Sequence, residues 1–136
     1  MHRFSVRVYY SDTDCGGIVY HGRYLDFAEH ARTELLREVA QSRGLEGSQT
    51  RLIEQDILAF VVKSITVDYQ KPAYLDDLLE VRTEIEQQKR FSIIFRQTVY
   101  RQEEIICTLL VKVASIHTLN LRPVPMPDYF STSSSS

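Results

Sequence analysis

The residues best suited to chemistry are gathered in one short segment, Tyr10–Tyr24. It holds two carboxylates, a glycine pair and a histidine, namely Asp12, Asp14, Gly16, Gly17 and His21. A predicted amphipathic helix follows at once, and a helix N-terminus presents unpaired backbone N–H groups with a partial positive charge. Such donors stabilise a developing oxyanion while a nearby carboxylate attacks a carbonyl or activates water. The segment therefore predicts a site for carbonyl chemistry.

Each carboxylate has more than one interpretation. Asp14 can act as a nucleophile or as a general base, and both roles stay open. Aspartates in such loops also serve as Asx-turn or helix-cap residues. Asp12 is predicted to be the structural member of the pair, closing the loop through backbone N–H groups. Gly16 and Gly17 are predicted to allow a tight turn and a close approach of the backbone to a ligand.

Hydrophobic periodicity predicts the elements that position this segment. Residues 3–10 alternate like a half-buried strand, and Tyr24–Val39 follow helical spacing in a long helix that is expected to end near Gly44. Four further strands are predicted at residues 57–69, 79–86, 91–100 and 105–116, with an antiparallel meander among them. The fold class is therefore α+β. One helix covers only one face of such a sheet, so we expect its edges to need a partner chain.

Composition and charge exclude several classes of protein. With 136 residues, 43% of them hydrophobic, the chain is predicted to form one domain over residues 1–130, followed by a disordered Ser-rich tail at 131–136. A net charge of −2 argues against a dedicated nucleic-acid binder. No apolar run is long enough to cross a bilayer, and the first residues lack a signal peptide's apolar centre. The only cysteines, Cys15 and Cys107, have no metal-ligand spacing and predict a cytoplasmic protein.

Two segments resemble a known family. Asp12–His21, followed by Tyr24 and Ala31–Glu34, is similar to the 4-hydroxybenzoyl-CoA thioesterase family, and more narrowly to the acyl-CoA thioesterases associated with the bacterial Tol-Pal system. Tyr69–Asp77, followed by Leu79–Val81, is similar to the family's second segment. The resemblance implies a hotdog fold, in which a curved antiparallel sheet wraps a central helix. It also implies dimers, commonly paired into tetramers, with active sites at the dimer interface.

The resemblance also implies an activity, the hydrolysis of acyl-CoA to a free acid and coenzyme A without a metal or redox cofactor. Asp14 matches the family's catalytic carboxylate. His21 matches a position that offers its backbone N–H to the thioester oxygen, so the peptide rather than the imidazole is expected to act. Lys89 and Arg90 occupy a turn similar to the family's nucleotide contacts and are expected to bind the substrate phosphates. Acyl-carrier protein is an alternative to coenzyme A as the thiol portion of the substrate.

Several alternatives stay open in the sequence. Tyr20 and Tyr24 are expected to line the acyl pocket, although helical spacing also places Tyr24 in the core. Glu29 and Glu34 lie on the helix, where some distant hotdog enzymes place their carboxylate, and ion pairs explain them equally well. A hotdog dehydratase or hydratase would carry a His-x-x-x-Gly pattern, which His21 does not begin. A non-catalytic module that binds acyl-CoA or acyl-carrier protein would keep the fold without needing a catalytic carboxylate.

Overall fold

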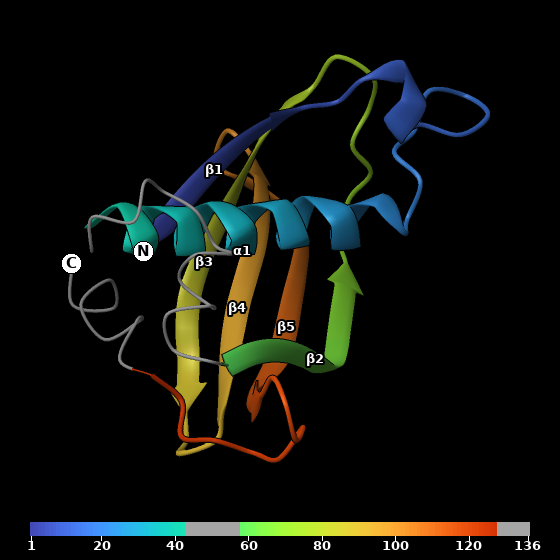
Figure 1. Ribbon diagram of the computed structural model, residues 1–136. Helices are drawn as coiled ribbons and strands as arrows, with labels where there is room; N and C mark the ends of the chain where they lie inside the picture. The colour runs from blue at the N-terminus through green and yellow to red at the C-terminus, as the bar shows by residue number, and fades with distance from the viewer. Residues whose placement is uncertain (43–57, 128–136) are drawn as a thin grey trace.

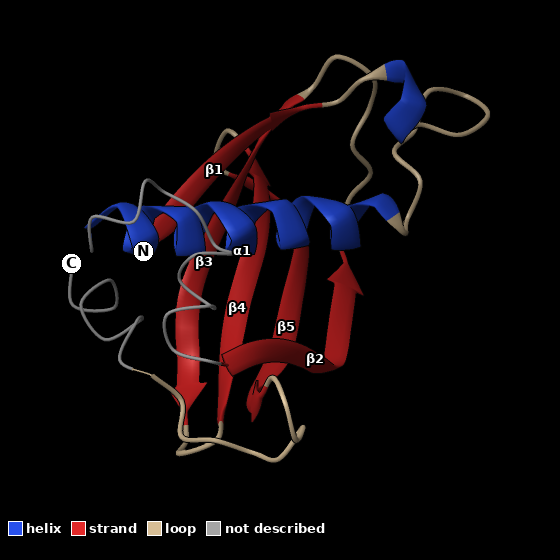
Figure 2. Ribbon diagram, in the orientation of Figure 1, coloured by secondary structure: helices blue, strands red, loops and turns tan. Residues whose placement is uncertain are grey.

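A single long helix lies across one face of a five-stranded antiparallel sheet (Figures 1 and 2). The computed structural model describes residues 1–42 and 58–127. The elements in chain order are β1 (His2–Arg7), a 3-10 turn (Tyr10–Asp12), α1 (Arg23–Ser42), β2 (Leu58–Tyr69), β3 (Leu78–Gln88), β4 (Ser92–Arg101) and β5 (Glu104–His117). This is the hotdog arrangement, and it confirms the predicted α+β class.

The order of the strands in the sheet is β1-β3-β4-β5-β2. The meander prediction is therefore right for β3, β4 and β5, which pair in sequence order. It does not extend to β2, which pairs with β5 at the opposite edge of the sheet from β1. Residues 70–77, which follow β2, carry the chain across to β3. Periodicity reports that a strand exists, whereas the edge it occupies depends on contacts with distant strands.

The element boundaries differ from the predicted ones for local reasons. β1 ends at Arg7 rather than near Tyr10, because the chain turns into the 3-10 segment. β3 continues through Gln88, two residues beyond its predicted end at residue 86, with an irregularity in pairing between Ile85 and Gln87. α1 is described through Ser42. The expected helix end near residue 44, the first residue of the strand predicted at 57–69 and the predicted Ser-rich tail lie outside the described residues.

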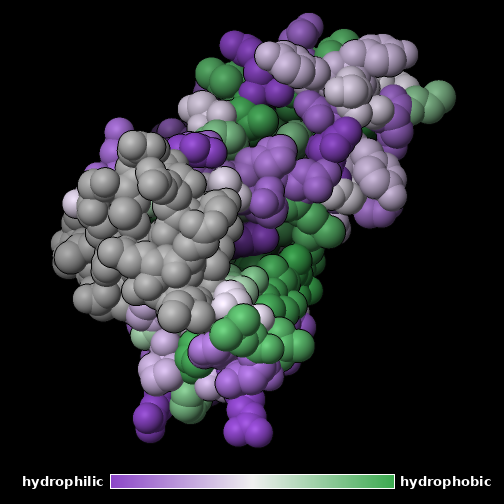
Figure 3. All heavy atoms as spheres, in the orientation of Figure 1, coloured by the Kyte–Doolittle hydropathy of each residue, from purple (hydrophilic) through white to green (hydrophobic). Residues whose placement is uncertain are grey.

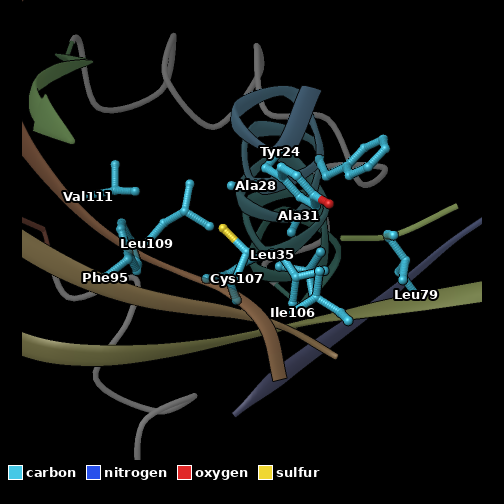
Figure 4. Close-up of a cluster of buried hydrophobic side chains, with 14 of the residues drawn as sticks. Tyr24, Ala28, Ala31, Leu35, Leu79, Phe95, Ile106, Cys107, Leu109 and Val111 are labelled. Carbon is cyan, nitrogen blue, oxygen red and sulfur yellow. The ribbon is translucent and has the colours of Figure 1, made fainter. Parts of the chain in front are cut away.

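The core lies between α1 and the inner face of the sheet (Figure 4). The helix contributes Tyr24, Phe27, Ala28, Ala31 and Leu35, and the strands contribute Leu79, Phe95, Ile106, Leu109 and Val111. Small alanine side chains at the centre of the buried helix face leave room for large strand residues to pack close to the helix. Within the described part of the chain, no helix has the length and apolar character needed to cross a membrane.

Strand β2 is an apolar edge that the helix leaves uncovered. Its side chains Val62, Ile65 and Tyr69 are 44%, 37% and 47% exposed. They pair across the ladder with buried residues of β5, so they lie on the same face of the sheet as α1. Figure 3 shows hydrophobic surface, in green, gathered at the lower right, where Figure 1 places β5 and β2. A single chain thus exposes part of its own inner face.

Candidate active site

The loop before α1 is held in place by Asp12. The Tyr9 N–H donates to Asp12 Oδ2 at 2.8 Å, and Arg23 Nε lies 3.1 Å from Asp12 Oδ1. The Tyr20 N–H donates to the Asp12 carbonyl at 3.0 Å. One residue therefore ties the end of β1, the returning arm of the loop and the first turn of the helix together. This is the geometry that a structural role for Asp12 requires.

The tip of the loop needs its two glycines. Gly16 and Gly17 have φ angles of 103° and 76°, in the region that residues with a side chain rarely adopt. A Cβ atom at either position would meet nothing within 4 Å among the described residues, so the backbone angle rather than space selects glycine. The turn closes through hydrogen bonds from Asp14 N–H to the Ile18 carbonyl at 3.0 Å and from Gly17 N–H to the Asp14 carbonyl at 3.2 Å. Asp14 therefore lies at the base of a fixed turn.

Distant residues anchor both arms of this loop. The Val8 N–H donates to the Asp77 carbonyl and the Val19 N–H donates to the Ala73 carbonyl, each at 2.9 Å. Residues 73–77 belong to the second segment that carried the family resemblance. The two segments are thus neighbours in space, because the connection between β2 and β3 is hydrogen bonded to the loop.

Asp14 lies in a polar hollow beside the start of α1. The hollow has a volume of about 350 Å³ and is lined by Ser11, Thr13, Asp14, Tyr20, Gly22, Arg23 and Asp26. The Asp14 side chain is exposed there. The Arg23 guanidinium next to it is shared between Asp12 and Asp26, at 3.1 and 3.0 Å. A carboxylate in such an open position is accessible to a bound thioester or to water.

His21 faces a different pocket. This pocket, of about 310 Å³, is lined by Ile18, Val19, His21, Tyr24, Tyr69, Gln70, Lys71 and Pro72. The His21 ring lies between the rings of Tyr20 and Tyr69, with centroids 4.4 and 6.3 Å away. Among the described residues, no backbone acceptor is found for the His21 N–H. The His21 ring thus belongs to this second pocket, whereas Tyr20 and Gly22 line the hollow that holds Asp14.

Tyr24 joins the second pocket to the core. It is 3% exposed, and its ring contacts the rings of Phe27 and Tyr69, with centroids 6.0 and 5.8 Å away. Burial raises the pKa of Tyr24 to about 12, partly opposed by a hydrogen bond with the Ala73 backbone. Burial likewise raises the pKa of the Cys107 thiol to about 12. Both groups are therefore neutral at physiological pH. Tyr24 lines the second pocket and is also buried in the core, so it belongs to both.

Lys89 and Arg90 do not share a pocket with Asp14 in one chain. They lie in the turn between β3 and β4, whereas the Asp14 loop packs near the start of β3. The 11 residues of β3 separate these two ends by about 35 Å at the usual rise of a strand. Lys71, in contrast, lines the His21 pocket, with its Nζ 2.6 Å from Glu104. Within one chain, Lys89 and Arg90 therefore lie far from the Asp14 hollow.

The helix carboxylates are engaged in local contacts. Glu29 accepts a hydrogen bond from the Thr33 hydroxyl at 3.0 Å, and Glu34 lies 3.5 Å from Arg37. Cys15 is a free cysteine and is exposed in the loop. Tyr69 is the residue that the sequence interpretation missed, because its alternating pattern marked a strand position and nothing local shows that its hydroxyl meets the His21 backbone at 2.9 Å.

Comparison with known proteins identifies the family of this chain. The family model described as "Thioesterase superfamily" matches residues 16–108. The acyl-CoA thioesterase YbgC of Haemophilus influenzae is 47% identical over 91% of this chain and 87% of its own length. The acyl-CoA thioester hydrolase YbgC of Escherichia coli is 41% identical over 93% of this chain and 90% of its own length.

Solved structures show the same fold. A probable thioesterase from Bartonella henselae superposes with a TM-score of 0.80 at 32% identity, covering 93% of this chain and 98% of that one. A 1,4-dihydroxy-2-naphthoyl-CoA thioesterase from Synechocystis reaches a TM-score of 0.82 at 21% identity, covering 99% and 96%. At that lower identity the likeness concerns the fold alone. Together with the family match and the relatives above, these findings confirm the resemblance seen in the motifs, and the chain belongs to the thioesterase superfamily.

Proposed function

We propose that this protein hydrolyses acyl-CoA thioesters, with Asp14 as the reacting carboxylate. One observation carries the proposal: Asp14 lies exposed in a polar hollow at the start of α1, in a chain whose close relatives are named acyl-CoA thioesterases. The family match supports the reaction class. The geometry supports the residue, because the carboxylate sits on a rigid turn beside backbone donors.

Two mechanisms of hydrolysis are open to Asp14. In the first, Asp14 attacks the thioester carbonyl, coenzyme A leaves as a thiolate, and water hydrolyses the resulting mixed anhydride. In the second, Asp14 takes a proton from a water molecule that attacks the carbonyl, and the tetrahedral intermediate expels the same thiolate. In both, the carbonyl oxygen becomes an oxyanion that the His21 N–H stabilises. Tyr20 and Tyr24 flank the path of the acyl group.

A second copy of the chain completes the site in this proposal. The exposed apolar edge of β2 supports a homodimer, because an uncovered hydrophobic edge strand favours pairing. Dimers paired into a tetramer agree with the family expectation. Lys89 and Arg90 of a second chain then bind the phosphates of coenzyme A, or of an acyl-carrier protein. A cytoplasmic location is consistent with two cysteines that are not joined to each other.

The substitution Asp14→Asn tests the function. It keeps the size of the side chain and removes the negative charge, so neither attack nor proton abstraction is available. We expect thiol release from a panel of short, long and aromatic acyl-CoA substrates to fall by at least about 1,000-fold, with thermal unfolding unchanged. Glu103→Gln, at a carboxylate 87% exposed in the β4–β5 turn, is the control. Turnover by Asp14→Asn equal to that of the parent contradicts the assignment.

A further inference from the structure

Tyr69, the last residue of β2, is hydrogen bonded to the loop that precedes α1. Its hydroxyl donates to the His21 carbonyl at 2.9 Å, across 48 positions of sequence. Its ring also packs edge-on against the rings of His21 and Tyr24, with centroids 6.3 and 5.8 Å away. Desolvation by burial raises the pKa of Tyr69 above its ordinary value, so the hydroxyl keeps the proton that it donates. Tyr69, at the edge of the sheet, thus fixes the orientation of the peptide group between His21 and Gly22.

The orientation of that peptide determines where the next N–H points. The His21 carbonyl and the Gly22 N–H belong to one planar trans peptide, in which the two groups point in opposite directions. The carbonyl points toward Tyr69, on the side of the His21 pocket. The Gly22 N–H is therefore directed away from Tyr69, and Gly22 lines the hollow that contains Asp14. Within the described ranges no backbone acceptor is found for this N–H.

We propose that the Gly22 N–H is a second oxyanion donor facing Asp14, and that Tyr69 is the positioning residue that orients it. The inference rests on the proposed thioesterase function. When Asp14, or the water it activates, adds to the thioester carbon, the carbonyl π-electrons move to oxygen and the Gly22 N–H donates to that oxyanion. The electrons return as the C–S bond breaks and coenzyme A leaves as a thiolate. Two donors hold the oxyanion better than one.

The side-chain environment of Gly22 agrees with this role. A Cβ atom at this position would lie 2.8 Å from Tyr20 Cε2. The Tyr20 ring thus packs directly over Gly22, on the side of the Asp14 hollow that both residues line. Glycine lets the ring pack there, whereas a larger residue would displace Tyr20 from the wall of the hollow.

The first test is Tyr69→Phe, which removes the hydroxyl and keeps the ring that packs on His21 and Tyr24. Loss of one well-placed oxyanion donor costs about 100- to 1,000-fold in kcat, and we expect a misoriented one to cost at least about tenfold. KM and the inhibition constant of an S-alkyl thioether of coenzyme A, which has no carbonyl oxygen, should stay within about twofold. Tyr100→Phe, on β4 beneath the Arg82 guanidinium, is the matched control. An unchanged kcat in Tyr69→Phe overturns the inference.

The second test removes the donor itself. Replacing Gly22 by glycolic acid converts the His21–Gly22 amide into an ester and deletes only the N–H. We expect kcat to fall about 100-fold with unchanged inhibition by the thioether. If Tyr69→Phe does not fold, this second variant tests the inference alone. An ester at Gly22 with parental kcat overturns the inference. If either variant has parental activity while Asp14→Asn is inactive, the Gly22 donor is rejected and the proposed thioesterase function is retained.

Discussion

Asp12 and Asp14 lie two residues apart in one loop, yet their carboxylates differ in their hydrogen-bond and ion-pair partners. The oxygens of Asp12 are taken up by the Tyr9 N–H and the Arg23 guanidinium. The Asp14 carboxylate has no hydrogen-bond or ion-pair partner among residues 1–42 and 58–127, and it faces an open hollow. A carboxylate whose oxygens are already engaged is a poorer nucleophile than a free one, so Asp12 fits the structural role and Asp14 fits the role proposed for it.

The raised pKa values of buried groups predict a loss of stability at alkaline pH. Cys107 and Tyr24, with ordinary pKa values of 9.0 and 10.0, are both held at about 12 by burial. Above about pH 9 the unfolded chain releases protons that the native chain retains, so the free energy of unfolding falls as pH rises toward 12. Urea unfolding at about pH 8 and about pH 10.5, under reducing conditions, should show a smaller fall for Cys107→Ala than for the parent. The exposed Cys15→Ala should behave like the parent, and equal falls in all three proteins contradict the prediction.

At the scale of elements, one buried amide joins the helix to the sheet. Gln97 of β4 is 0% exposed, and its Nε2 donates to the Ala28 carbonyl and to the Thr83 hydroxyl at 2.9 and 3.0 Å. Its Oε1 accepts from the Arg32 guanidinium at 2.8 Å. Because α1 begins directly after the loop that holds Asp14, this contact also links the end of that loop to the sheet.

Removing this amide should destabilise the protein. Gln97→Leu leaves the half-buried Arg32 without its Gln97 acceptor and the Ala28 carbonyl without this side-chain donor, which lowers the free energy of unfolding by about 1–3 kcal/mol. Urea titration measures the change, with Gln88→Leu at the exposed end of β3 as the control. Adding Arg32→Met to Gln97→Leu should recover part of the loss, because the stranded cation is gone. A double variant that is less stable than the sum of the two single variants contradicts this account.

The elements themselves follow from short-range pattern, and their arrangement does not. Apolar spacing from Tyr24 to Val39 and alternation along β3 to β5 depend on neighbouring residues, so the sequence predicts them. The position of β2 at the far edge depends on pairing with β5, from Leu58 opposite His117 to Tyr69 opposite Cys107, which are distant in the chain. The same limit applies to the site. Asp14 and Gly16-Gly17 form a local motif, whereas the contact of Tyr69 with His21 and the separation of Lys89 from Asp14 arise only when the strands assemble.

At the scale of the whole molecule, β2 predicts a self-association that activity depends on. Ile65 lies near the middle of this edge, 37% exposed on the inner face. Ile65→Lys places a charge where a second copy is proposed to pack, so we expect a shift from dimer or tetramer to monomer in light scattering, with loss of hydrolysis. Glu103→Lys in the β4–β5 turn should keep the parental mass and rate. A parent that is monomeric at assay concentrations and fully active contradicts the proposed assembly.

The anchoring of the loop by residues 69–77 also has a consequence for the nascent chain. Val8, Val19 and His21 each take a hydrogen-bond partner that is encoded roughly fifty to seventy positions later, in Asp77, Ala73 and Tyr69. During synthesis, Asp14 and its glycine turn therefore leave the ribosome long before the segment that anchors their loop has been made. Contacts of such long range form late in folding. A partly synthesised chain therefore contains the loop residues without the contacts that hold them in place. We expect hydrolytic activity only after the second half of the sheet has been made.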